Sequence, residues 1–70
     1  METTLVFFSI SDIKATVARH HLTEAGIESF VVNKKDSVYS GILGGTVEVF
    51  VRVDDEEKAR QILEEHNMFD

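Results

Sequence analysis

The alternation of hydrophobic and polar positions divides the chain into five segments. Residues 4–10 (TLVFFSI) are short, apolar and rich in β-branched and aromatic side chains, which favours a strand. Residues 27–33 and 46–53 predict two further strands, and the second of these alternates most cleanly. Apolar residues recur with helical spacing in residues 11–26 and again after Asp54. The predicted order is strand–helix–strand–strand–helix.

The ends of both predicted helices carry recognisable capping residues. Ser11 or Ser9 can cap the first helix, and Gly26 is placed to end it in a left-handed conformation. Asp54 can cap the last helix, with a glutamate three residues later to complete a capping box, and Asn67 can end it.

Each element has a predicted core face. In the strand over 46–53, alternate valines point one way and the intervening residues point the other way. In the strand over 27–33, Ile27, Ser29 and Val31 share the core face. The predicted core positions of the helices and of the third strand are Val17, Ala18, Leu22 and Ala25, then Val47, Val49, Val51 and Val53, then Ala59, Ile62, Leu63 and His66.

This order of elements predicts an α+β two-layer sandwich of the ferredoxin-like type. A right-handed crossover places the third strand between the first and second, so that a three-stranded antiparallel sheet of order 1-3-2 carries both helices on one face. The usual fourth strand is missing or reduced to the tail at Met68 and Phe69. We expect residues 1–70 to form one domain.

A sheet covered by helices on one face only leaves its other face open. We expect Phe50 to point to that face, with Phe30 and Val32 beside it and either Phe7 or Phe8 from the first strand. Such an apolar surface favours self-association into a dimer or trimer, unless the tail or the loop over 34–45 folds across it. The expected oligomer interface comprises Phe8, Phe30, Val32, Phe50 and Arg52, with Glu28 and Glu48 at its rim.

The stretch VYSGILGG, residues 38–45, raises the question of a phosphate site. Its glycines precede a strand rather than a helix, and the spacing matches no phosphate-binding fingerprint, which favours a hairpin loop. Exposed loops of this kind often contact partners. The predicted ligand or partner residues are Lys34, Lys35, Tyr39, Gly41, Ile42, Leu43, Gly44 and Gly45.

Composition excludes several classes of function. Thirteen acidic residues against seven basic ones give a net charge of −6, which disfavours binding to nucleic acid. The chain has no cysteine, no segment that resembles a signal peptide, and no apolar stretch that could span a membrane. We therefore expect a cytoplasmic protein without membrane contact.

The histidines and serines do not assemble into a recognisable active site. His20 and His21 are neighbours on one helix and point in different directions, while His20 and Glu24 alone are too few for a metal site. His21 lies within the apolar arc, where a partly buried imidazole with a backbone partner is the simplest interpretation. No motif indicates a nucleophile with its base, so we expect no enzyme, metal or cofactor.

Several motifs together resemble a known bacterial family. They are LTEAGIESFVVN, the loop SGILGG, the strand VEVFV and the helix DDEEKARQILEE. Over residues 4–66 they resemble the small domains of unknown function called "putative prokaryotic signal transducing proteins". The resemblance implies a fold similar to the PII nitrogen-regulatory proteins, which are ferredoxin-like trimers that bind nucleotide between subunits. Here the corresponding loop is short and carries no PII nucleotide-binding signature, so the resemblance implies no nucleotide-binding residues.

Two functional hypotheses follow from these observations. The first is a non-enzymatic regulatory or protein-interaction module that associates through the open sheet face and uses the 34–45 loop as a contact surface. The alternative is a sensor of a small ligand, a nucleotide or metabolite, held between subunits near the same loop.

Overall fold

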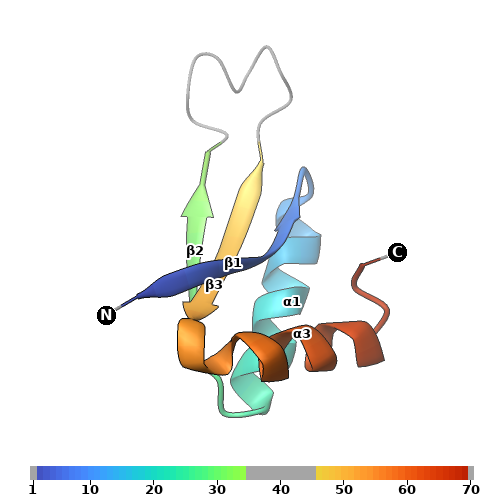
Figure 1. The fold of residues 1–70 in the computed structure, drawn as a ribbon. Helices are drawn as coiled ribbons and strands as arrows, with labels where there is room; N and C mark the ends of the chain where they lie inside the picture. Colours follow the sequence, from blue (N-terminus) through green and yellow to red (C-terminus); the bar gives the residue numbers. More distant parts are fainter. Residues whose placement is uncertain (1, 35–45, 70) are drawn as a thin grey trace.

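The computed structural model describes residues 2–34 and 46–69 and has the predicted α+β ferredoxin-like arrangement (Figure 1). A three-stranded antiparallel sheet of order β1-β3-β2 packs against two α-helices. The elements are β1 (Thr3–Ser9), α1 (Asp12–Glu24), β2 (Ser29–Asn33), β3 (Val47–Arg52), the 3-10 turn η1 (Val53–Asp55) and α3 (Glu56–Glu65).

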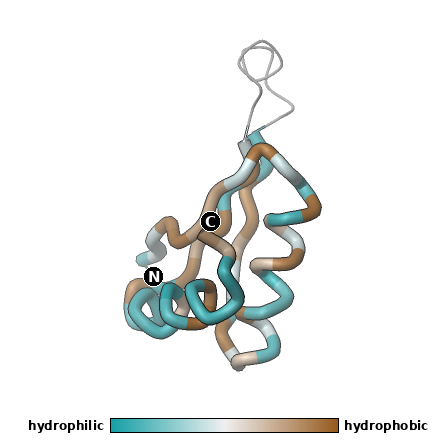
Figure 2. Tube along the Cα trace, turned by 90° about the vertical axis from the view of Figure 1, so that its right-hand side faces the viewer, coloured by the Kyte–Doolittle hydropathy of each residue, from teal (hydrophilic) through white to brown (hydrophobic). Residues whose placement is uncertain are grey.

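The core lies between one face of the sheet and both helices, and Figure 2 shows brown apolar positions along the strands and, among teal polar ones, along the helices. The small residues Ala15, Ala18 and Ala59 let the helix backbones approach the sheet closely, and Leu22 and Leu63 fill the remaining space. The core residues are Val6, Phe7, Ala15, Ala18, Leu22, Ile27, Val47, Val49, Val51, Ala59 and Leu63.

A β-bulge in β1 decides which phenylalanine enters the core. The pairing of β1 with β3 shifts register between Leu5 and Phe7, so that Val6 is an extra residue and both Val6 and Phe7 are buried. Normal alternation resumes after the bulge. Phe7 is therefore only 5% exposed in the core, whereas Phe8 is 64% exposed on the opposite face.

Both helices end with the same backbone motif, as the sequence predicted at Gly26 and Asn67. After α1, Gly26 has φ +81° and the N–H of Ile27 donates to the carbonyl oxygen of Leu22 at 2.9 Å. After α3, Asn67 has φ 57° and the N–H of Met68 donates to the carbonyl oxygen of Leu63 at 2.9 Å. These are Schellman motifs, and each turns an apolar residue back onto the core.

The helix starts differ from each other. At α1 the predicted cap is confirmed, because the Ser11 hydroxyl accepts a hydrogen bond from the Lys14 N–H at 3.3 Å. At the other helix the prediction of an Asp54 cap was wrong. The chain first makes the 3-10 turn η1, so that Asp55 occupies the cap position without a side-chain hydrogen bond. The same turn removes Val53 from the strand and leaves it exposed.

Three further predicted core positions lie outside the core. Val17 is 39% exposed because α1 contacts the sheet along Ala15 and Ala18, and Val17 lies about 100° round the helix from Ala18. His66 is exposed because α3 ends at Glu65, so His66 lies beyond the helix and not on its buried face. Val31 pairs with Val49 on the helix side but is exposed at the sheet edge.

The C-terminal tail lies beside β1 without joining the sheet. Residues 66–69 form turns, and the described part of the chain contains no fourth strand. The ring centroids of Phe69 and Phe7 are 6.3 Å apart, and Met68 packs against the core. Because Phe7 belongs to the helix side of the sheet, this contact leaves the other face uncovered by the tail.

Candidate interaction surfaces

The sheet face opposite the helices carries a row of large apolar side chains. We call this surface the open face. Leu5 of β1 and Phe30 of β2 both pair with Phe50 of β3, so the three side chains cross the sheet side by side. Phe8 and Val32 both pair with Glu48, one step further along the sheet. Leu5, Phe8 and Val32 are exposed, while Phe30 and Phe50 are half-buried.

Ion pairs stand at the two ends of the open face. At one end the Arg52 guanidinium lies 2.6 Å from a Glu28 carboxylate oxygen. At the other end the Lys34 ammonium lies 3.2 Å from a Glu48 carboxylate oxygen. Each end therefore presents one cation and one anion; Glu28, Glu48 and Arg52 are the residues predicted for the rim, and Lys34 joins them.

The predicted ligand or partner loop falls mainly on residues that the structure does not describe. Lys34 is the exception, and the structure pairs it with Glu48. The other predicted loop residues, Lys35, Tyr39, Gly41, Ile42, Leu43, Gly44 and Gly45, lie outside the described residues.

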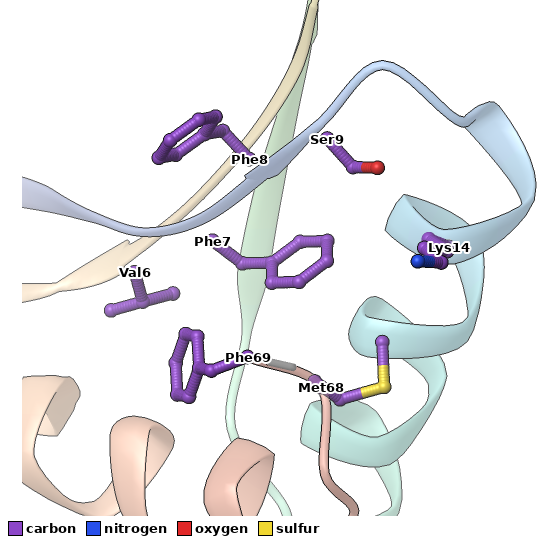
Figure 3. A pocket seen from close by; sticks show the side chains of 7 residues that line it. All are labelled: Val6, Phe7, Phe8, Ser9, Lys14, Met68 and Phe69. Atoms are coloured by element: carbon purple, nitrogen blue, oxygen red, sulfur yellow. The ribbon is translucent and has the colours of Figure 1, made fainter.

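A second apolar site lies along the outer edge of β1 (Figure 3). It is an open cavity of about 280 Å³ between β1, the first turns of α1 and the tail. In Figure 3, Phe7 points from β1 toward α1, Met68 and Phe69 approach from the tail, and Lys14 stands on α1 at the side of the cavity. The lining residues are Val6, Phe7, Phe8, Ser9, Lys14, Met68 and Phe69. We call this site the β1-edge cavity.

The histidines form a stack that links the two helices. The rings of His21 on α1 and His66 after α3 are parallel, with an interplanar angle of 6° and centroids 3.7 Å apart. Loss of solvent and the neighbouring imidazoles of His66 and His20 lower the pKa of His21, because each disfavours its charged form, and Glu24 opposes them. His20 itself lies 2.7 Å from the Glu24 carboxylate.

Sequence reasoning missed both the β1-edge cavity and the histidine stack. The cavity depends on where the tail lies, and the tail follows from the turn at Asn67. The stack depends on the packing of α1 against α3, although both histidines had been placed on the inward arcs of their helices. The two inward arcs could have been placed against each other, and this would have predicted the contact between His21 and His66.

Two kinds of site are missing from the described residues. Across residues 2–34 and 46–69, no three histidine, aspartate or glutamate side chains gather closely enough to hold a metal ion. No helix in the same residues has the length and hydrophobicity needed to cross a bilayer.

The fold defines the chain as a small α+β domain of ferredoxin-like topology. Within that class, residues 4–67 match the family described as "Putative prokaryotic signal transducing protein", and the chain belongs to this family. Comparisons with curated proteins and with solved structures give no significant match.

Proposed function

We propose that this protein is a cytoplasmic, non-enzymatic module of bacterial signal transduction that self-associates through the open face of its sheet. The family description supports a role in signalling. The observation that carries the proposal is the row of apolar side chains on the open face, with Phe8 at its most exposed point.

The apolar content of the open face favours a protein partner. Five large apolar side chains from all three strands lie together there, and monomeric proteins rarely leave such a continuous surface in water. Burying these side chains would also add to the small core of a chain of 70 residues, which alone supplies little stability.

The charges at the ends of the face favour a second copy as that partner. A two-fold axis through the centre of the face would bring the Lys34–Glu48 end of one copy over the Arg52–Glu28 end of the other. Each cation would then meet an anion of the partner, so the rim is complementary to itself. A homodimer is the simplest closed assembly with this property.

Sedimentation velocity tests the proposal directly. We expect the protein to sediment as a dimer, or as another closed oligomer, at tens of micromolar. Phe8→Asp should convert it to a folded monomer because Phe8 is the most exposed apolar side chain of the open face and the new charge would be buried in the contact. Ile13→Asp is the matched control: Ile13 is 77% exposed on α1, away from the open face, and its substitution should leave the assembly intact.

Two results would overturn the proposal. One is a wild-type protein that sediments as a clean monomer under these conditions. The other is an assembly that survives Phe8→Asp but dissociates with Ile13→Asp, which would place the contact on the helical side.

A further inference from the structure

The β1-edge cavity runs along the edge of a strand. Four consecutive residues of β1, from Val6 to Ser9, line it. Beyond the bulge, Phe7 and Phe8 belong to opposite faces of the sheet, and a cavity that touches both residues follows the strand's edge. Among the described residues β1 pairs only with β3, and its outer edge therefore presents N–H and C=O groups that no strand occupies.

This edge lacks two of the usual protections against strand addition, charged residues and proline. Natural edge strands carry charged residues or proline, yet no residue from Thr3 to Ser11 is charged and the chain has no proline. The bulge at Val6 interrupts only the first half of β1. Beyond it, Phe7, Phe8 and Ser9 pair regularly with β3, so this half can act as a template for another strand.

The apolar walls of the cavity suit a single side chain. Phe7, Met68 and Phe69 enclose a space of about 280 Å³, which is below the range of most small-molecule sites. A second cavity of about 160 Å³ adjoins it, sharing Lys14 and Met68 and lined further by Ile13 and Val17. The apolar surface thus continues past Lys14 on both sides.

Lys14 supplies the charge that the cavity offers a ligand. It is the charged residue among the described residues that line the site, and it makes no ion pair within residues 2–34 and 46–69. An ammonium group beside an apolar cavity is complementary to a carboxylate next to an apolar side chain.

We propose that the outer edge of β1 binds an extended acidic peptide segment of a partner protein. The segment adds to the sheet beside β1, inserts one apolar side chain into the β1-edge cavity next to Phe7 and Phe69, and places a carboxylate on Lys14. Backbone hydrogen bonds would give the affinity, while the cavity and Lys14 would give the specificity. The binding surface shares Phe8 with the open face but is otherwise formed by the outer edge of β1, Lys14 and the tail, so this inference does not rest on the self-association proposed above.

A peptide titration followed by ¹⁵N NMR tests the inference. The probe is a synthetic nonapeptide of alternating threonine and valine that carries one leucine and one glutamate two positions apart, so that both side chains share a face. We expect saturable shifts of the Phe7–Ser9, Lys14 and Met68 amide signals. The same peptide with lysine in place of glutamate should bind at least tenfold more weakly.

A charge swap separates recognition from damage to the fold. Lys14→Glu should reverse the preference, so that the lysine peptide binds better than the glutamate peptide. Glutamate at this position completes a capping box with Ser11, so α1 should remain folded. Lys58→Glu, at the same position of the first turn of α3, changes net charge equally and should leave binding unchanged.

Three outcomes would overturn the inference. They are the absence of saturable binding by the glutamate peptide, equal binding of both peptides by the wild type, and shifts confined to the open face. A Lys14→Glu variant that keeps the original preference would overturn the role of Lys14 and with it the predicted acidic ligand.

Discussion

The two faces of β3 differ although they belong to one strand. Val47, Val49 and Val51 point to the helices and are buried, whereas Glu48 and Phe50 are half-buried on the open face and Arg52 is exposed there. The buried face packs against both helices and so specifies the fold. The open face retains large apolar side chains that the described chain does not cover. Its hydrophobicity therefore serves contacts with other molecules better than it serves the monomer's own packing.

The strongest test of this difference compares two adjacent residues of β3. Val49→Asp should abolish folding, because it buries a carboxylate in a core without a partner, at a cost of several kcal/mol. Phe50→Asp makes a similar chemical change one residue later, on the open face, and should leave a folded domain that no longer associates. Circular dichroism reports the folding of each variant, and sedimentation reports its assembly.

Equal loss of structure in both variants would show that the open face also supports the fold of the monomer. Retention of structure by both would show that the assignment of the two faces is incorrect.

A smaller effect is expected where α1 turns back to the sheet. Gly26 has φ +81° and a Cβ built there meets no atom within 4 Å, so Gly26→Ala should cost only the backbone strain, about 1–2 kcal/mol. Asn67→Ala at the equivalent turn after α3 should cost less. Asparagine, unlike glycine, already bears part of the strain of a positive φ, so alanine adds less to it. Urea unfolding curves measure both changes in the free energy of unfolding. A Gly26→Ala variant as stable as the wild type would contradict the prediction that alanine is strained at this position.

The smallest effect concerns pH and the contact between the helices. The lowered pKa of His21 means that the folded protein binds fewer protons than the unfolded chain at mildly acidic pH. Stability should therefore be highest above the ordinary histidine pKa of about 6.5 and fall as the pH drops through the lowered pKa of His21. Thermal unfolding between about pH 8 and pH 5 measures this slope.

Removal of the stacked ring provides the control for the pH effect. His66→Asn leaves the C-terminal turn intact but removes an imidazole that faces His21, and it should flatten the slope. Because loss of solvent, the largest cause, and the neighbouring His20 still lower the pKa of His21, part of the slope should remain. An unchanged slope would mean that His66 does not influence the protonation of His21.

The sequence predicted those parts of the structure that depend on local periodicity. Alternation in residues 46–53 fixed the two faces of β3, and Gly26 and Asn67 marked the helix ends. The choice between Phe7 and Phe8 could not be predicted, because an extra residue in β1 is apparent only from its pairing with β3. Val17 was misplaced for a similar reason: the rotation of α1 depends on its contacts with the sheet.

Of the two candidate surfaces, one could be predicted from local periodicity and the other could not. The open face follows from alternation and was predicted, with Phe30, Val32 and Phe50 together. The β1-edge cavity arises where the C-terminal tail meets β1, since Phe69 lies against Phe7, and no local pattern contains that contact.

The bulge at Val6 also limits how the sheet can misassemble. A strand of perfect alternation can slip by two residues along its neighbour and still bury apolar side chains, so its alignment is weakly defined. In β1 the two successive buried residues, Val6 and Phe7, interrupt the alternation at one point of the native alignment with β3. A slipped pairing would leave the extra residue without a place in the core. We therefore expect the inserted residue to favour the native register of β1 against β3 during folding.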